Sequence, residues 1–223
     1  MKHCPCPVLD VFSAVRCLKD GGVIVYPTET FYALGCLAAN APAVEGIYRL
    51  KRRSLRKKLP LVAADYSQAA TVASFSEGAQ RLATQFWPGP LSLLVPVRNT
   101  CGECRLPEYL INAQGAVAIR VSGSSLARKL AFLAGGPLTA SSANVSGNPP
   151  AAEITALDED VLSALSSLGL PAGLLPPPDM ADGPAGGKSS TIVEPLTLHA
   201  VRVVREGAVS IQSLKAAGFS CLV

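Results

Sequence analysis

Two short polar segments far apart in the chain have the residue types and spacing to hold an oxyanion. Lys51 and Arg53 lie two residues apart in a stretch, 49–58, that contains seven basic side chains and no acidic one. Ser142 and Asn144 have the same spacing and follow a predicted strand. Residues two apart point to different sides of a helix but share a face in extended backbone, so each pair can grip one phosphate or carboxylate only outside a helix. Each signal is weak by itself, because strand ends rich in Ser and Asn are commonly simple turns.

The positive charge of the protein is concentrated in the stretch 49–58. The chain has 20 Lys and Arg against 16 Asp and Glu, and seven of the basic residues lie in this stretch, so 13 basic residues face 16 acidic ones elsewhere. Like charges this close together repel one another, and a bound polyanion would relieve the repulsion. The sequence therefore indicates a site for a polyanion such as a phosphate chain. The alternative is a solvated loop or a disordered basic arm, which such runs commonly are.

The scarcity of histidine disfavours several kinds of catalytic site. His3 and His199 are the two histidines of the chain, and neither lies in a motif that would position an imidazole. A Ser-His-Asp hydrolase, a His-ligated catalytic metal and a His general base are therefore disfavoured. The segment 183–189 resembles a phosphate-binding loop, but Asp182 stands where the motif requires glycine and a strand follows instead of a helix. No Gly-x-Gly-x-x-Gly follows a predicted strand, so a dinucleotide-binding fold is unsupported as well.

Composition indicates a globular protein with reduced thiols. The 223 residues are enough for one large domain or two small ones, and 49% of them are hydrophobic. The N-terminus lacks an apolar signal-peptide core and no run reaches the roughly 18 apolar residues that span a bilayer, so we expect a cytoplasmic protein with no membrane partner. Seven cysteines, an odd number, fit free thiols better than a disulfide framework. Cys101 and Cys104 have the spacing of a zinc half-site that His3, Cys4 and Cys6 could complete, but ordinary reduced cysteines explain the same residues.

Alternating strand and helix patterns position these segments, and they predict a single α/β domain. A helix over 8–20 ends at Gly21, a buried strand follows at 22–26, and Pro42 begins a helix that leads into the basic stretch. Further strands are expected at 59–64, 91–97, 115–121, 137–141, 189–194 and 199–205, and further helices at 66–73, 76–86, 124–134, 153–168 and 210–217. The Pro- and Gly-rich segment 169–187 has no periodicity, so we expect a lid or a mobile linker there.

These elements predict a twisted sheet of mixed parallel and antiparallel strands, flanked by helices. We expect the domain to span 8–210, with terminal segments at 1–7 and 211–223. The order of strands in the sheet does not follow from the pattern.

A series of motifs between residues 10 and 210 resembles that of one known family, in the family's order. They are Pro27-Thr28-Glu29-Thr30 with Tyr32-Ala33-Leu34-Gly35, Tyr48-Arg49-Leu50-Lys51-Arg52-Arg53, Trp87-Pro88-Gly89-Pro90-Leu91, Ala118-Ile119-Arg120-Val121, Ser142-Ala143-Asn144-Val145-Ser146-Gly147, Ser190-Thr191-Ile192-Val193 and Val204-Arg205-Glu206-Gly207-Ala208. The chain is similar to the threonylcarbamoyl-AMP synthases, proteins with a YrdC-like domain that act in tRNA modification. The family's hallmark is a Lys-x-Arg pair facing a Ser-x-Asn pair, which here are Lys51 with Arg53 and Ser142 with Asn144. The resemblance implies a YrdC-like fold in its short, single-domain form.

The resemblance also implies an activity, that of a nucleotidyltransferase. Such an L-threonylcarbamoyladenylate synthase makes threonylcarbamoyl-AMP and pyrophosphate from L-threonine, bicarbonate or CO2, and ATP; a threonylcarbamoyl-transferase complex then modifies the tRNA adenosine next to the anticodon. An amine and CO2 form a carbamate without an enzyme nucleophile, and the carbamate attacks the α-phosphate, so positioning and charge neutralisation do most of the work and no histidine is required. Mg²⁺ is expected with ATP, held largely by phosphate oxygens and water, with no metal ligands from the protein.

By the same resemblance, site residues are assigned one by one. The catalytic set is Lys51, Arg53, Ser142 and Asn144; ATP would contact Arg53, Lys57, Ser142 and Arg205; threonine would contact Thr30, Arg120 and Ser190. The chain departs from the family pattern at Ala33 and Glu206, where glycine and proline are usual, and around 57–63, which is one residue longer and lacks a histidine that some members carry. These departures bear on the threonine pocket.

Two alternative functions stay open. One is a module that grips tRNA or double-stranded RNA backbone through the basic stretch, and the other is a paralogue that keeps the fold without the activity. Charge alone cannot separate a triphosphate from an RNA backbone. The presence of Arg120 and of the Ser142 and Asn144 pair favours the enzyme, because an RNA-binding module has no evident need for them.

Overall fold

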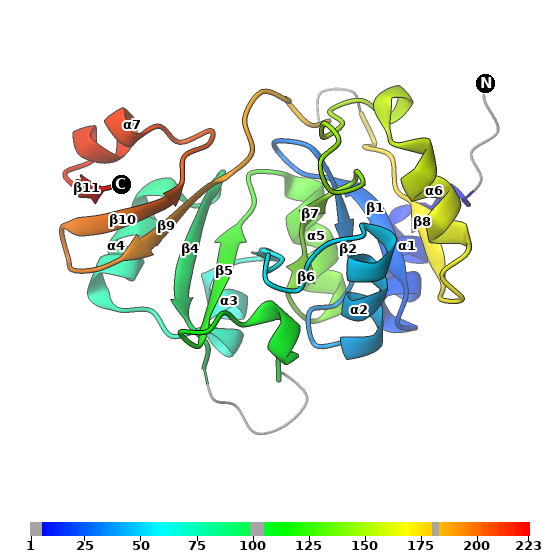
Figure 1. The fold of residues 1–223 in the computed structure, drawn as a ribbon, viewed down its shortest axis with the longest axis horizontal. Coiled ribbons are helices and arrows are strands. Elements are labelled where there is room, and N and C mark those ends of the chain that lie inside the picture. The colour runs from blue at the N-terminus through cyan, green and yellow to red at the C-terminus, as the bar shows by residue number, and fades with distance from the viewer. Residues whose placement is uncertain (1–5, 99–104, 180–182) are drawn as a thin grey trace.

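The strands of the protein form two sheets that lie side by side (Figure 1). Our computed structural model describes residues 6–98, 105–179 and 183–223. Within these residues the smaller sheet has the order β7-β2-β1-β8 and the larger sheet the order β11-β10-β9-β4-β5-β3-β6. The smaller sheet consists of β1 (Val23–Pro27), β2 (Tyr32–Gly35), β7 (Ser141–Ser142) and β8 (Ala172–Leu174). The larger sheet consists of β3 (Leu61–Ala63), β4 (Leu91–Pro96), β5 (Ala116–Val121), β6 (Leu138–Thr139), β9 (Thr191–Pro195), β10 (Ala200–Arg205) and β11 (Ser220–Leu222).

Both sheets mix parallel and antiparallel pairs. In the smaller sheet β1 pairs antiparallel with β2 and parallel with β8. In the larger sheet β5 pairs antiparallel with β4 and parallel with β3. The predicted α/β class with mixed strand pairing is therefore confirmed, but the strands divide between two sheets where we expected one.

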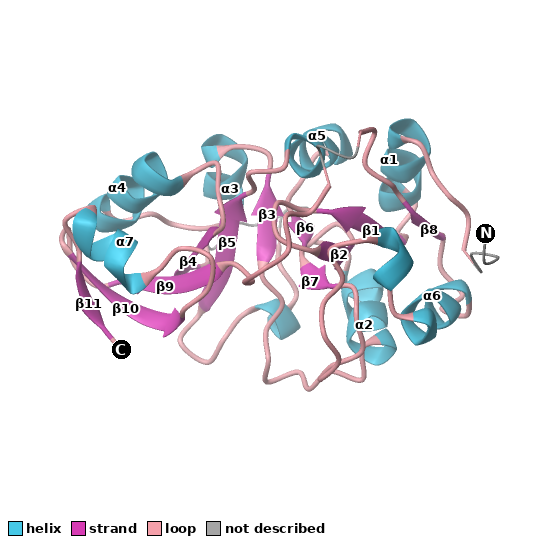
Figure 2. Ribbon diagram, turned by 90° about the horizontal axis from the view of Figure 1, so that it is seen from above, coloured by secondary structure: helices cyan, strands magenta, loops and turns pink. Residues whose placement is uncertain are grey.

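Helices cover both sides of the smaller sheet and one side of the larger sheet. They are α1 (Val11–Lys19), α2 (Ala41–Leu50), α3 (Tyr66–Val72), α4 (Glu77–Phe86), α5 (Ser125–Ala134), α6 (Glu159–Ser166) and α7 (Ile211–Ala216), with short 3-10 turns at Glu108–Leu110 and Ile154–Ala156. Figure 2 shows α1, α3, α4 and α5 on one side of the sheets and α2 and α6 on the other side, over the smaller sheet. Each of these α-helices begins after an Asp, Asn or Ser whose side chain accepts a hydrogen bond from a backbone N–H of the first turn. These caps explain why the predicted helix starts hold to within three residues, except for the helix expected from 153, whose α-helical part begins at Glu159.

The two sheets meet where the chain passes from β6 into β7. Thr139 ends β6 in the larger sheet, and Ser141 begins β7 in the smaller one. The Tyr26 hydroxyl of β1 donates to the Thr139 carbonyl at 2.9 Å, and the Cys36 N–H after β2 donates to the Thr139 hydroxyl at 3.1 Å. A Cβ at Gly35 would lie 2.4 Å from the Tyr26 ring, so this contact between the sheets requires glycine there.

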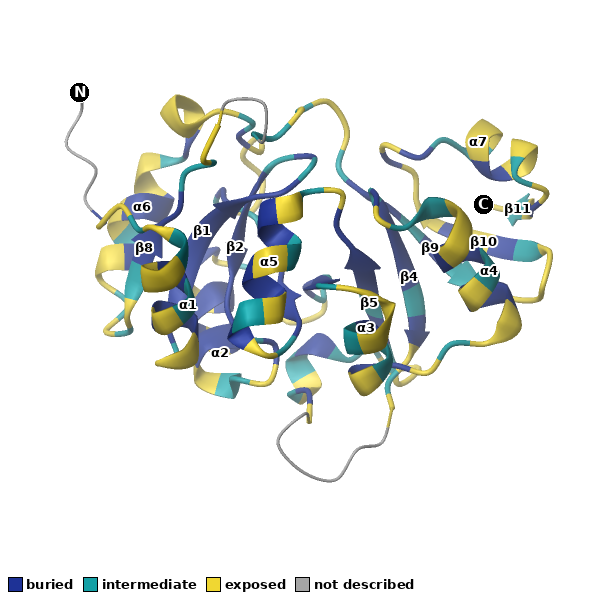
Figure 3. Ribbon diagram, turned by 180° about the vertical axis from the view of Figure 1, so that it is seen from behind, coloured by how far each residue is buried: buried dark blue, intermediate teal, exposed yellow. Residues whose placement is uncertain are grey.

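The central strands are deeply buried, as Figure 3 shows by their dark blue colour, whereas β10 and β11, at one end of the larger sheet, are partly exposed. All five residues of β1 and all four of β2 are buried. The helices bury one apolar face and expose the other, which is the arrangement their sequence periodicity predicts. A core of this kind holds the loops between the two sheets in fixed positions.

Three segments differ from the sequence-based expectations. The connector 169–187 contains a strand, β8, which pairs with β1. This strand is too short, and has too many prolines beside it, to show a period in the sequence. The single strand expected at 137–141 is divided between β6 and β7. The helix expected at 153–168 is a 3-10 turn followed by α6.

The C-terminal segment 211–223 packs onto the larger sheet. α7 buries Leu214, and β11 pairs parallel with β10 after the buried Phe219. No period revealed β11, because it has three residues at the sheet edge.

The cysteine and membrane expectations are tested only in part. His3, Cys4, Cys101 and Cys104 of the possible zinc site lie outside the described residues. Cys17, Cys36 and Cys221 carry free thiols, and burial raises the pKa of Cys36 to about 12. In the parts of the chain that the structure describes, no helix is both long and apolar enough to cross a membrane.

Candidate functional site

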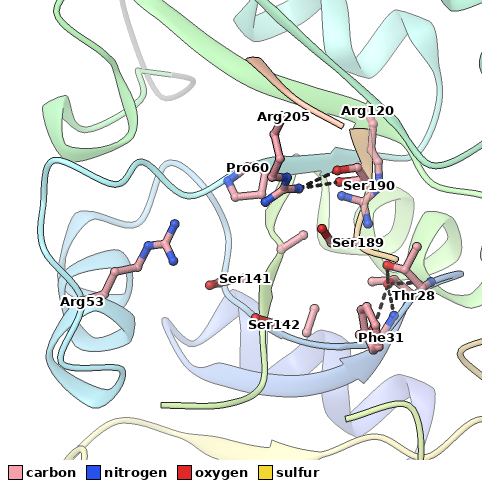
Figure 4. Close-up of a pocket in the computed structure, with 13 residues that line it drawn as sticks. Thr28, Phe31, Arg53, Pro60, Arg120, Ser141, Ser142, Ser189, Ser190 and Arg205 are labelled. Atoms are coloured by element: carbon pink, nitrogen blue, oxygen red, sulfur yellow. Dashed lines mark hydrogen bonds between the residues drawn. The ribbon is translucent and has the colours of Figure 1, made fainter. Parts of the chain in front are cut away.

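A polar pocket lies between the two sheets and encloses about 490 Å³ of space, part of it open to solvent (Figure 4). Its walls come from five places in the chain: the turn between β1 and β2, the loop after α2, the end of β5, the β6–β7 passage, and the segments flanking β9 and β10. The lining residues are Thr28, Thr30, Phe31, Ala33, Arg53, Pro60, Arg120, Ala140, Ser141, Ser142, Ser189, Ser190 and Arg205. The pocket therefore combines three guanidinium groups with several hydroxyls, and none of the described residues that line it is acidic.

Arg53 reaches the pocket because the preceding helix ends before it. α2 stops at Leu50, Lys51 is its C-cap, and Arg52 has a left-handed φ of 48° that turns the chain away from the helix axis. Arg53 Nε donates to the Lys57 carbonyl at 2.8 Å and Nη2 to the Lys58 carbonyl at 3.3 Å. These bonds hold the guanidinium toward the pocket (Figure 4). α2 has therefore ended before Lys51 and Arg53, which is the condition that their spacing set for gripping one anion together.

Lys51 has a different environment from Arg53. Its side chain is 1% exposed, and its ammonium donates to the carbonyls of Ser142 and Asn144, the second at 2.5 Å. Burial, together with the smaller effect of the Arg53 charge, lowers the pKa of Lys51 to about 8, against a smaller opposing effect of Asp158. Lys51 is not among the lining residues. It joins the basic stretch to the Ser142 and Asn144 segment through the main chain.

Ser142 and Asn144 also separate. Ser142 lines the pocket at the end of β7, whereas the chain turns after it and the Asn144 amide donates to the carbonyls of Val145 and Asn148 at 2.9 and 2.6 Å. Within the described residues Asn144 Oδ1 is buried and has no hydrogen-bond partner. Asp158, the N-cap of α6, accepts from the Val145 N–H and the Asn148 amide, which fixes this turn.

Arg120 lies at the end of β5 and is paired with Glu29. Its Nε donates to Glu29 Oε1 at 3.0 Å, and the hydroxyl of the fully buried Ser122 donates to Glu29 Oε2. Burial alone would raise the pKa of Glu29, but the charge of Arg120 and these hydrogen bonds outweigh it, so the pKa lies below its ordinary value. The pair is ionised at neutral pH and joins the β1–β2 turn of the smaller sheet to β5 of the larger one.

Arg205, at the end of β10, and Ser190, just before β9, line another part of the pocket. Arg205 Nη2 donates to the Ser190 carbonyl at 2.6 Å and to its hydroxyl at 3.3 Å, and Ser92 donates to the same hydroxyl at 3.4 Å. Burial lowers the pKa of Arg205, and the charges of Arg120 and Arg53 lower it further. This mutual repulsion means that three cations face one space, which an anion would stabilise.

The turn at 28–31 supplies hydroxyls to the opposite wall. The Thr28 hydroxyl donates to the Phe31 carbonyl at 2.7 Å and accepts from the Phe31 N–H at 3.3 Å. Thr30 lies 3.3 Å from it, hydroxyl to hydroxyl, and its carbonyl accepts from the Gly186 N–H at 2.8 Å. The end of the 169–187 connector is thus tied to this turn beside the pocket.

Most of the residues assigned from the sequence converge. Arg53, Ser142, Thr30, Arg120, Ser190 and Arg205 line the pocket, whereas Lys51 and Asn144 lie behind its wall and Lys57 is exposed outside the lining. The sequence did not assign Thr28, Phe31, Pro60, Ser141, Ser189 or Glu29. Thr28 and Glu29 stand within the Pro-Thr-Glu-Thr motif, and each unassigned serine is next to an assigned one, so adjacency to the motifs was the available signal.

Fold and site together define an α/β protein with a polar, arginine-containing pocket between two sheets, and comparison with known proteins gives the family. Residues 16–207 match the Sua5/YciO/YrdC family model, described as "Telomere recombination". The chain belongs to this family. It is 34% identical to the threonylcarbamoyl-AMP synthase of Stenotrophomonas maltophilia over 183 residues, which are 80% of this chain and 96% of that protein. It is 36% identical to the synthase of Coxiella burnetii over 146 residues, 65% of this chain and 75% of that one.

Solved structures have the same fold. The crystal structure of P. abyssi Sua5 complexed with L-threonine superposes with a TM-score of 0.77 at 25% identity, over 97% of this chain. The present chain spans 61% of the length of that protein. E. coli YciO superposes with a TM-score of 0.70 at 24% identity, over 92% of each chain, a likeness of fold.

Proposed function

We propose that the protein is an L-threonylcarbamoyladenylate synthase, a nucleotidyltransferase that uses L-threonine, bicarbonate or CO2, and ATP. The observation that carries the proposal is the convergence of Arg53, Arg120 and Arg205 on one pocket lined by hydroxyls. A carboxylate and a polyphosphate are the ligands that such a set of forked cations suits. The 34% identity to a synthase of similar length supports the same conclusion.

The proposed reaction needs positioning more than a protein nucleophile. The threonine amine and CO2 form a carbamate; a carbamate oxygen then bonds to the α-phosphorus of ATP, the bond from that phosphorus to the β-bridging oxygen breaks, and pyrophosphate leaves with the electron pair. In this scheme Arg120 holds the threonine carboxylate with Thr30 and Ser190 beside it. Arg53 and Arg205 offset the charge of the phosphates, and the Ser142 hydroxyl contacts the nucleotide. Lys51 keeps the Ser142 segment in place.

A divalent cation would enter with ATP in this proposal. In the described parts of the chain no group of three His, Cys, Asp or Glu side chains could hold a metal ion, and Glu29 is already occupied by Arg120 and Ser122. Mg²⁺ prefers phosphate oxygens and water when carboxylates are few, so the donor set fits an ion carried by the triphosphate. The ion would offset phosphate charge during the transfer.

The proposal extends to later steps. The adenylate would pass to a threonylcarbamoyl-transferase complex that modifies tRNA.

The test is substrate dependence of pyrophosphate release. Purified protein with ATP, Mg²⁺ and bicarbonate should release pyrophosphate only when L-threonine is present, and mass spectrometry should detect threonylcarbamoyl-AMP. Arg53→Ala should lower turnover at subsaturating ATP about tenfold with its thermal unfolding unchanged, and Arg56→Ala, an exposed residue of the same loop, is the matched control. Pyrophosphate release that is independent of threonine would contradict the proposal.

A further inference from the structure

The three arginines of the pocket differ in what compensates their charge. Within the described residues Arg53 donates to two backbone carbonyls and Arg205 to a carbonyl and a hydroxyl, all of them uncharged. Arg120 alone among the three pairs with a carboxylate, that of Glu29. Two of the guanidiniums therefore present a full positive charge to a ligand, and the third presents a charge that is partly neutralised.

Glu29 cannot turn away from Arg120 without breaking several contacts. Oε1 accepts from Arg120 Nε and Oε2 accepts from the Ser122 hydroxyl, so both carboxylate oxygens are occupied. The side chain is 15% exposed and packs so closely on Gly123 that a Cβ there would lie 3.3 Å from Glu29 Cβ. The backbone carbonyl of Glu29 accepts from the Ala185 N–H at 3.2 Å. The negative charge is thus fixed beside one arginine.

This arrangement leaves a specific part of Arg120 for a ligand. Glu29 occupies Nε, on the stem side of the guanidinium, and the two terminal nitrogens remain as a fork of the kind that binds a carboxylate through two hydrogen bonds. Arg120 lines the pocket opposite Arg53 (Figure 4). Arg205 lies on the same side of the pocket as Arg120, so two neighbouring guanidiniums differ in that, among the described residues, only Arg120 is paired with a carboxylate.

We propose that Glu29 is a specificity-determining residue that reserves Arg120 for a singly charged carboxylate and directs phosphate groups to Arg53 and Arg205. The energy that a fixed negative charge adds to a bound anion grows with the charge of that anion, so Glu29 opposes a phosphate dianion about twice as strongly as a carboxylate. Without Glu29 the three arginines would be equivalent sites for phosphate. This inference rests on the proposed function, since it assigns the threonine carboxylate to Arg120.

The test compares Glu29→Gln, which removes the charge but keeps the size, with Glu29→Asp, which keeps the charge but shortens the side chain. Calorimetry measures the Kd of L-threonine and of inorganic phosphate for each protein, and of threonine in the presence of phosphate. In Glu29→Gln we expect the ratio of threonine to phosphate affinity to shift about tenfold toward phosphate, with phosphate now competing against threonine. Glu29→Asp should stay within about threefold of the wild type.

Glu194→Gln is the matched control, because it removes the carboxylate of the exposed Glu194–Arg202 pair on β9 and β10 and leaves the pocket unchanged. Its two Kd values should equal those of the wild type. Thermal unfolding of every variant checks the fold. If Glu29 only filled space and accepted hydrogen bonds, Glu29→Gln would match the wild type and Glu29→Asp would not, and that result overturns the inference, as does an equal shift in both.

Failure of the proposed function is distinguishable. If the wild-type protein binds threonine but releases no threonine-dependent pyrophosphate, only the proposed function is contradicted. The affinities for threonine and phosphate can still be compared among the variants. If the wild-type enzyme is active and Glu29→Gln leaves the ratio of threonine to phosphate affinity unchanged, only the Glu29 inference is contradicted. Wild-type protein that binds no threonine contradicts both.

Discussion

The basic stretch and the pocket both gather positive charge, but they do so in opposite ways. In the stretch, Arg49, Arg52, Arg56 and Lys57 are neighbours in sequence and are exposed to solvent. In the pocket, Arg53, Arg120 and Arg205 come from widely separated positions and face one space, and among the described residues Glu29 is the carboxylate that compensates them. Exposed charges are screened by water and salt, whereas partly buried ones are screened much less. Convergence in space therefore matters more for the site than density along the chain.

Within the stretch itself, Lys51 and Arg53 repeat the contrast at a separation of two residues. Lys51 is buried against carbonyls of the β7 segment, and Arg53 faces the pocket. One acts on the protein's own main chain and the other is free to meet a ligand. The variants below test this division, from the largest expected effect to the smallest.

Replacing Arg120 should have the largest effect. Arg120→Ala removes the fork and leaves the Glu29 carboxylate without its cation, so kcat/KM for threonine should fall by about two to three orders of magnitude. Steady-state kinetics with varied threonine measure the loss, and thermal unfolding checks the fold. Arg120→Lys keeps the charge but not the fork, and full activity in that variant would contradict a bidentate role.

The buried position of Lys51 should make the free energy of unfolding depend on pH. Its folded pKa of about 8 lies below the ordinary value of 10.5, so the unfolded chain binds more protons between these values and the free energy of unfolding rises with pH across that window. Relative to Lys51→Met, the wild type should gain about 2 kcal/mol from pH 8 to 10.5. Urea unfolding at several pH values measures this difference, and parallel curves for the two proteins would refute the assignment.

Arg53 and its exposed neighbour should differ in their effect on ATP. Arg53→Ala is expected to raise the KM for ATP about tenfold, because the pocket loses one partly buried cation that is proposed to contact the phosphates. Arg56→Ala should change it by less than about twofold, since surface charges contribute little. Equal effects at 53 and 56 would show that charge density, not convergence, sets the affinity.

Arg52 should have the smallest effect, and through the backbone alone. Its φ of 48° lies in the left-handed region, so Arg52→Gly should keep or raise the free energy of unfolding by up to about 1 kcal/mol. Arg52→Val should lower it by about 1 kcal/mol, because a β-branched residue is strained there. Denaturant unfolding compares the two. The KM for ATP should stay unchanged in Arg52→Gly.

Much of the fold could be predicted because its signals are local. The helix over 8–20, the strand at 22–26 and the helix begun at Pro42 each follow from caps, glycines and apolar period, and the structure has α1, β1 and α2 there. β8 and β11 were not predicted, because three-residue strands are defined by their partners β1 and β10 and have no period of their own. The division into two sheets escaped prediction for the same reason, since Thr139 and Ser141 join different sheets two residues apart.

By itself the sequence determined the type of most elements and the residues that carry polar or charged groups, since these depend on neighbours along the chain. Only the tertiary structure decided which of those groups meet. It turned Lys51 inward to the main chain, brought Arg53, Arg120 and Arg205 to one pocket, and paired Glu29 with one of the three. Such pairings depend on how the two sheets pack, and no spacing along the chain encodes the distance between β5 and the β1–β2 turn.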